Sequence, residues 1–246
     1  MSNTALIIGG SSGIGYATAL RFAKGGTKVA ITSRNLEKAE VASATLSKLG
    51  YEAMPLKVDV CSSDSISLGV DSLVKHWGKL DFAFNNAGWE GEPGPIDELS
   101  EISWTKMIDI KLSGVWRGMK VQLKQMKIQG YGSVVNMAGS WGLDGFPNFA
   151  SYCAAAHGIV GLSRAAAKEI ASLGIRINCV CPGAVEAPML DRMVGGDQSM
   201  KDSFANQLAV KRLCSPEEVA EAVTWLCSDS ASYINGTTLT LDGSGY

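Results

Sequence analysis

The stretch ALIIGGSSGIGYATALRFAKGG, residues 5–26, joins a short apolar run, a glycine-rich turn and a helical pattern without interruption. A run of aliphatic residues that ends at glycines is typical of a buried strand, and the segment after the turn favours a helix. The same arrangement recurs directly afterwards, as KVAITSR before NLEKAEVASATLSKLG and as AMPLKVDV before SSDSISLGVDSLVKHWG. The first third of the chain is therefore predicted to consist of strand–helix units.

Four further strands are predicted from the apolar runs LDFAFNNAG, GSVVNMAG, IRINCVCPG and TTLTLDG, with helices near 101–129, 149–173 and 215–228. Near-continuous apolar strands joined by helical crossovers are typical of a parallel sheet that is covered on both faces. We predict an α/β fold in which residues 1–246 form a single doubly wound, Rossmann-type domain with a seven-stranded parallel sheet.

The least regular part of the chain lies near 187–210. Its Gly195-Gly196 pair would allow this segment to close over a substrate site, although a plain surface excursion explains the same pattern. After it, the letters CSPEE predict a helix that is capped by Ser215 and begins at Pro216, with two carboxylates in its first turn.

Composition and charge exclude several classes of protein. The chain is 46% apolar with a net charge of −2, and it has no basic run, so we expect no nucleic-acid partner. The first residues lack the basic region of a signal peptide and no apolar run is long enough to cross a bilayer, so we expect a cytoplasmic protein without membrane association. The six cysteines lack the spacing of metal ligands and are interpreted as free thiols, with no metal site.

The glycine-rich turn has the pattern G-x-x-x-G-x-G at Gly9, Gly13 and Gly15. Glycines at these places let backbone amides approach a pyrophosphate at the positive end of a helix. The turn alone is a weak signal, but the motifs VDV, NNAG and CPG end three later strands and so lie at the same carboxyl edge of the predicted sheet. Together these motifs predict a dinucleotide site.

The order of the glycine turn, NNAG, Tyr152, the later Pro-Gly and the closing LDG resembles the short-chain dehydrogenase/reductase family over essentially the whole chain. The resemblance implies that Asp59 and Val60 flank an adenine, that NNAG lines the middle of the cofactor, and that Val185 meets the nicotinamide. Turn and resemblance together predict these cofactor-binding residues: Gly9, Ser11, Ser12, Gly13, Ile14, Gly15, Ser33, Arg34, Asp59, Val60, Asn86, Ala87, Gly88, Tyr152, Pro182, Gly183 and Val185.

The end of the second strand indicates which nicotinamide cofactor is bound. An acidic residue there would accept a hydrogen bond from a free ribose 2′-hydroxyl, whereas this chain has Ser33 and Arg34. Because a planar guanidinium pairs with a phosphate, the two residues favour NADP over NAD. An exposed arginine without a ligand is the alternative interpretation.

The stretch SYCAAAHG, residues 151–158, has the tyrosine expected of the family but not the lysine four residues later. The resemblance implies a tyrosine that transfers a proton, a lysine that assists it, a serine that binds the carbonyl oxygen and an asparagine that supports a water chain. Tyr152 fits, whereas Lys111, Gly139 and Ala156 stand in place of the asparagine, the serine and the lysine. Ser140, one residue late, is the alternative hydroxyl. Two cofactor-side threonines of the family are also replaced, by Ile8 and Ala187.

Lys111 returns to the predicted pocket the positive charge that Ala156 removes. It lies on a predominantly apolar helix face, so it either extends out to solvent or faces the pocket, where it would polarise Tyr152, donate a proton or form a Schiff base. The candidate catalytic residues are therefore Tyr152, Lys111 and Ser140.

We predict an NADP-dependent oxidoreductase that transfers a hydride to an apolar or bulky C=O or C=N substrate, with proton delivery rebuilt around Tyr152 and Lys111. The small-molecule pocket is expected to be walled by aromatic and apolar residues, namely Trp89, Trp141, Leu143, Phe146 and Met189. The clustered departures also fit an engineered variant of a ketone reductase. The alternatives are non-redox lyase, isomerase or aldol chemistry that uses Lys111, and a catalytically impaired nucleotide-binding protein. The resemblance implies a homotetramer that assembles through the two long helices.

Overall fold

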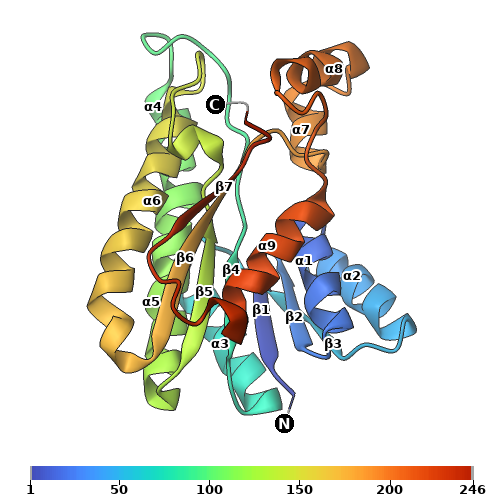
Figure 1. Ribbon diagram of the computed structural model, residues 1–246, viewed down its shortest axis with the longest axis vertical. Coiled ribbons are helices and arrows are strands. Elements are labelled where there is room, and N and C mark those ends of the chain that lie inside the picture. Colours follow the sequence, from blue (N-terminus) through green and yellow to red (C-terminus); the bar gives the residue numbers. More distant parts are fainter. Residues whose placement is uncertain (1, 245–246) are drawn as a thin grey trace.

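The computed structural model describes residues 2–244, and within them seven parallel strands form one sheet in the order β3-β2-β1-β4-β5-β6-β7 (Figure 1). The predicted α/β fold is confirmed. Because β4 pairs with β1 on the side opposite β2, the strand order reverses beside β1, which is where sheets of this type bind ligands. The strands are β1 (Thr4–Ile8), β2 (Lys28–Ser33), β3 (Ala53–Lys57), β4 (Phe82–Asn85), β5 (Gly132–Met137), β6 (Ile175–Pro182) and β7 (Thr238–Leu241).

Helices cover both faces of the sheet, and each face has its own apolar core. One core is formed with α1 (Gly13–Lys24), α2 (Leu36–Lys48) and α9 (Pro216–Cys227), which contribute Phe22, Leu46 and Val223 respectively. The other core is formed with α3 (Ser63–Trp77), α5 (Gly114–Gln129) and α6 (Ala150–Ile170), which contribute Leu73, Met119 and Ile159. Strands that are apolar on both faces are thereby shielded from water on both sides.

The helical region predicted near 101–129 is present but is interrupted in its middle. It consists of α4 (Glu101–Met107), a π-helical turn from Ile108 to Ser113, and α5. A π turn is wider than an α turn and is found mostly at functional sites. Lys111 lies in this turn and is 3% exposed, so the interruption leaves the lysine inside the molecule.

Arg117 of α5 holds the π turn against the loop between β3 and α3. Its guanidinium donates to the backbone carbonyls of Asp109 and Val60 at 3.3 and 3.2 Å, and to the Asp109 carboxylate at 2.5 Å. Backbone groups inside a protein need hydrogen-bond partners, and Arg117 supplies one for the turn.

The segment near 187–210 is more regular than its sequence indicates. It contains α7 (Pro188–Met193) and α8 (Gln198–Gln207), separated by Gly195 and Gly196 with φ of +60° and +78°. Helix α9 begins at Pro216, as predicted. Ser215, directly before the helix, and Glu218, in its first turn, form a reciprocal capping box.

Short 3-10 turns at Ser140–Gly142, Ala171–Leu173 and Asp229–Ala231 complete the helical segments. Between residues 2 and 244, none of the helices combines the length and the apolar character that a membrane-spanning segment requires.

Candidate active site

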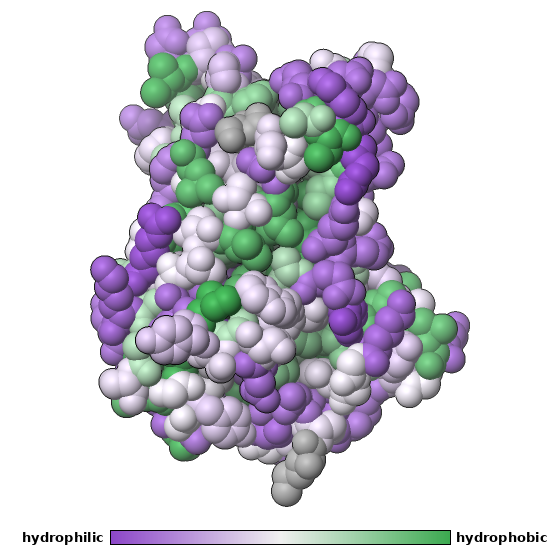
Figure 2. All heavy atoms as spheres, in the orientation of Figure 1, coloured by the Kyte–Doolittle hydropathy of each residue, from purple (hydrophilic) through white to green (hydrophobic). Residues whose placement is uncertain are grey.

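A cavity of about 660 Å³ opens at the carboxyl ends of the central strands. It begins at the glycine turn after β1 and extends past β4, β5 and β6 to α7 and α8. Figure 2 shows the molecule divided at its upper end, with apolar atoms gathered between the two parts. The cavity therefore lies where the reversal of strand order predicts a ligand site.

The glycine turn has the backbone geometry that its pattern predicts. Gly9 and Gly13 adopt φ of +77° and +52°, and a Cβ on Gly15 would lie 2.1 Å from the Gly9 carbonyl oxygen. That carbonyl accepts a hydrogen bond from the Asn86 side chain at 3.0 Å, which ties the turn to the end of β4. The turn is thus tightly folded, with glycine at the positions where a Cβ would be strained or would clash.

Most of the predicted cofactor residues line this one cavity. The exceptions are Gly15, which packs beneath the turn, and Asp59, whose carboxylate accepts a hydrogen bond from the Cys61 backbone N–H at 3.0 Å. The predicted residues that do line it are Gly9, Ser11, Ser12, Gly13, Ile14, Ser33, Arg34, Val60, Asn86, Ala87, Gly88, Tyr152, Pro182, Gly183 and Val185.

The end of β2 is positively charged. Ser33 and Arg34 line the cavity, and so does Lys38 in the first turns of α2. Among the described residues that line the cavity, Glu90 is the only carboxylate. It lies in the loop after β4 and not at the end of β2. Lys38 was not predicted, although its spacing of four residues from Arg34 at a helix start is a signal that would have found it.

Lys111 and Tyr152 meet at the other end of the cavity. The Lys111 Nζ lies 4.1 Å from the centroid of the tyrosine ring, which is the geometry of a cation–π contact. Within residues 2–244 this ammonium forms no ion pair with a carboxylate. The structure therefore brings together the two residues that the sequence analysis singled out, from the π turn and from α6.

The two other departures at the expected catalytic positions, Gly139 and Ala156, differ in their relation to the cavity. Gly139 has φ of +93°, and a Cβ there would lie 3.1 Å from the Tyr152 hydroxyl. Ala156 is fully buried and does not line the cavity. Ser140 lines the cavity from the first position of a 3-10 turn, directly after Gly139.

An aromatic cluster forms one wall. Trp141 stacks on Phe146 with centroids 4.3 Å apart and meets Tyr152 edge-on at 5.3 Å. Trp89, Trp141 and Met189 line the cavity as expected, but Leu143 and Phe146 do not, because Leu143 is exposed and Phe146 packs behind Trp141. Phe204 of α8 takes part in their place.

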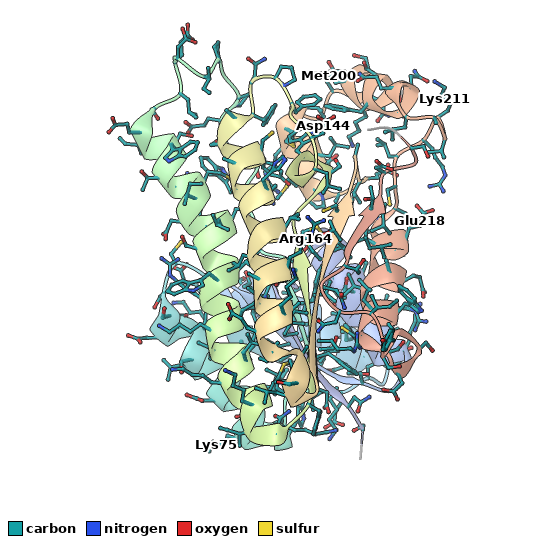
Figure 3. All side chains as sticks on the ribbon, turned by 60° about the vertical axis from the view of Figure 1, so that its left-hand side comes forward. Lys75, Asp144, Arg164, Met200, Lys211 and Glu218 are labelled. Carbon is teal, nitrogen blue, oxygen red and sulfur yellow. The ribbon has the colours of Figure 1, made fainter. Side chains whose placement is uncertain are left out.

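The segment after β5 and helix α8 lie at the same end of the molecule. Figure 3 shows this directly, with Asp144 and Met200 at the top and Lys75 at the opposite end. A side chain on α8 is therefore able to complete a wall that begins after β5, although the two are far apart in sequence.

The loop after β4 is joined to α7 by an ion pair. The Arg192 guanidinium donates to both carboxylate oxygens of Glu90, at 2.7 and 2.9 Å. These hydrogen bonds and the nearby charge hold the pKa of Glu90 below its usual range. The pair spans the cavity between two elements 102 residues apart, and sequence spacing gives no signal for it.

Lys106 of α4 lies at the same side of the cavity. Its Nζ is 3.8 Å from the centroid of the Trp89 ring, and both residues line the cavity. The lysine itself is exposed, and its pattern in the sequence is that of an ordinary solvated helix residue, which is why it was not predicted.

Comparison with known proteins gives consistent matches over the whole chain. Residues 9–246 match the family model described as enoyl-(acyl carrier protein) reductase. A cyclohexanol dehydrogenase from Acinetobacter sp. is 37% identical over 242 residues, which cover 98% of this chain and 94% of that protein. A levodione reductase from Leifsonia aquatica is 36% identical over 245 residues, covering 97% and 92%.

Solved structures agree with these matches. A levodione reductase structure has a TM-score of 0.94 at 35% identity and covers 98% of this chain and 96% of that one. The structure of ElxO with NADP bound has a TM-score of 0.93 at 32% identity, with coverage of 100% and 99%.

Proposed function

Because the chain belongs to the short-chain dehydrogenase/reductase family of oxidoreductases, we propose that it uses NADP to reduce the carbonyl group of a small, largely apolar substrate. The relatives named cyclohexanol dehydrogenase and levodione reductase support a ring compound as the substrate. The observation on which the mechanism rests is the contact of Lys111 with the ring of Tyr152.

The residues at the first end of the cavity fit NADP. The glycine turn lets the backbone come close to a ligand, and Arg34 and Lys38 line this end of the cavity with no acidic residue among the described lining residues there. Two cations at this place suit a ribose 2′-phosphate, which an aspartate would repel. Structural neighbours solved with NADP and with NADPH support the same choice. When bound, the reduced cofactor supplies the hydride.

Tyr152 is proposed to donate a proton from its hydroxyl to the substrate oxygen. Donation leaves a phenolate, and an ammonium 4.1 Å from the ring centroid stabilises that negative charge. Since Lys111 is buried, its charge acts in a medium that screens it less than water would. Ser140 is proposed to bind the same substrate oxygen in place of the hydroxyl that Gly139 lacks.

The charge of Lys111 favours C=O over C=N substrates. An iminium is already positive, and it would stand beside a buried ammonium that has no carboxylate partner among residues 2–244. Like charges that are close together in a protein interior repel strongly. A ketone is neutral, and its oxygen gains negative charge during reduction, so the ammonium of Lys111 attracts it.

The experiment is NADPH consumption with a panel of cyclic ketones and cyclic imines. We expect ketones to be reduced by the wild type and by Tyr131→Phe, an exposed tyrosine outside the cavity, and activity to fall at least about 100-fold in Tyr152→Phe. Tight NADPH binding without consumption for any ketone would contradict the proposal and favour an impaired nucleotide-binding protein. Trapping of a substrate on Lys111 by borohydride would instead favour aldol-type chemistry.

A further inference from the structure

The substrate end of the cavity has more positive than negative side chains. Lys106, Lys111 and Arg192 line it together with Glu90. Arg192 and Glu90 neutralise one another through their two hydrogen bonds. Lys106 lies near enough to Glu90 for its charge to help lower the pKa of that carboxyl, but neither Lys106 nor Lys111 forms an ion pair with a carboxylate among the described residues. A cleft lined by charge of one sign attracts ligands of the opposite sign.

The two lysines differ in what surrounds them. Lys111 is buried against Tyr152, where the reaction is proposed to occur. Lys106 is exposed and lies one element earlier, at the end of α4, with its ammonium 3.8 Å from the centroid of Trp89. The wide π turn that follows α4 places Lys106, Ile110 and Lys111 on the same cavity wall. The same wall therefore has two cations, Lys111 beside the reacting group and Lys106 toward solvent.

The contact with Trp89 holds the Lys106 ammonium at the cavity. A lysine stem is flexible, and a solvated lysine gains little from any single partner. An aromatic ring that also lines the cavity gives the ammonium one preferred position and leaves its remaining N–H donors for a ligand. Lys120 and Trp116 form a looser pair at 5.2 Å on α5, and neither of them lines the cavity.

We propose that Lys106 and Trp89 form a carboxylate subsite and that the preferred substrate is a keto acid, in which an apolar ring separates the reacting carbonyl from the carboxylate. This inference rests on the proposed function, because it assigns the carbonyl to Tyr152 and Lys111. A single ammonium without a guanidinium fork or backbone amides suits a carboxylate monoanion better than a phosphate. Trp141 and Met189, which line the cavity, supply apolar surface for the ring.

The kinetic test uses two substrates of nearly equal shape, a cyclohexanone with a ring carboxylate and the same ketone with a carboxamide. In the wild type we expect kcat/KM to be about fivefold higher for the carboxylate, the effect of one partly exposed ion pair. The ratio should fall to about one in Lys106→Gln, return in Lys106→Arg, and keep its wild-type value in the control Lys120→Gln. Added salt should lower the ratio in the wild type and leave it at about one in Lys106→Gln.

A binding test separates this inference from the proposed function. Cyclohexanecarboxylate and cyclohexanecarboxamide are titrated by calorimetry into the protein loaded with NADP, where no turnover takes place. We expect tighter binding of the carboxylate in the wild type and equal binding of both in Lys106→Gln. If no ketone is reduced but this preference is found, the subsite stands and the proposed reaction fails. Equal binding in the wild type, or a preference that survives in Lys106→Gln, would overturn the subsite.

Discussion

Lys111 is the residue at which this chain differs most informatively from its family pattern. It stands where the resemblance implies an asparagine, and the structure buries its ammonium against the ring of Tyr152. A buried ammonium is costly unless another group stabilises it, and here the group is the side chain proposed to transfer the proton. We propose that this lysine from the π turn takes the role of the lysine that α6 lacks at Ala156.

The first prediction concerns the coupling of these two side chains. Tyr152→Phe and Lys111→Met should each lower kcat/KM by about two to three orders of magnitude, and the double variant should lose little more, because groups that act as a unit are not additive. Methionine is chosen because it keeps most of the length of the lysine. The free energy of unfolding of each variant, measured alongside, shows whether the packing is preserved. Losses that multiply in the double variant would show that the residues act independently.

The second prediction concerns cofactor choice at the end of β2. Arg34→Asp should weaken NADPH binding by about tenfold to 100-fold, because a charge-assisted hydrogen bond is replaced by repulsion, while NADH binding stays the same or improves. Fluorescence titration of both cofactors measures this. Lys38→Gln should give a smaller effect of the same sign, and Lys48→Gln, at the far end of α2, should give none. Equal affinities of the wild type for both cofactors would contradict the assignment.

The π turn is the element that sets the position of Lys111, and Arg117 is the residue that holds the turn. Burial raises the pKa of Asp109, but the hydrogen bonds from Arg117 and Cys61 outweigh this and leave that pKa below its usual range. A carboxyl group with a lowered pKa in the folded state stabilises the fold above its unfolded pKa of about 3.9, and this contribution is lost as pH falls through the lower folded value.

The third prediction follows from this contact. Arg117→Gln should lower the free energy of unfolding by about 1–3 kcal/mol at neutral pH, because Asp109 and two backbone carbonyls lose a donor. The difference from the wild type should narrow in acid, below the usual carboxyl pKa, because protonation of Asp109 breaks the same ion pair. Urea unfolding of the wild type and the variant, at neutral pH and below the usual carboxyl pKa, measures this difference in the free energy of unfolding. Arg21→Gln, which removes an exposed ion pair, is the control. A difference independent of pH would show that the ion pair is not its cause.

At the scale of the whole molecule, the outer side of the α4 and α5 region exposes large apolar side chains. Ile102 and Ile128 are 82% and 83% exposed, and Trp104 and Trp116 are also open to solvent. Figure 3 shows α5 and α6 lying side by side along the molecule. Exposed apolar residues in this number on neighbouring elements are typical of a surface that contacts another protein.

The fourth prediction is that the chain forms a homotetramer through α5 and α6. Light scattering of the purified protein should give four times the mass of the chain, and Trp116→Glu should produce smaller species, because a charge would be buried at the contact. Val41→Glu, at an exposed apolar position on α2, should leave the mass unchanged. A monomeric wild type would contradict the prediction.

The sequence alone was sufficient for the α/β fold and for the glycine turn, because both depend on local patterns. An apolar run, a glycine that permits positive φ and a capping serine act within a few residues of themselves. The handedness of strand–helix–strand connections then leaves few ways to arrange seven parallel strands. The same local reasoning identified Arg34, whereas the placing of Tyr152 and Lys111 in one pocket came from the resemblance to the family.

Only the tertiary structure decided how the pocket is completed. The π turn depends on Arg117 reaching Val60, 57 residues earlier, and the wall beside it depends on Glu90 meeting Arg192 across 102 residues. Lys106 has the sequence pattern of a solvated helix residue, but the fold places it at the cavity with its ammonium over the ring of Trp89. Contacts between residues so far apart depend on how whole elements pack, and no periodicity or spacing within the chain encodes their geometry.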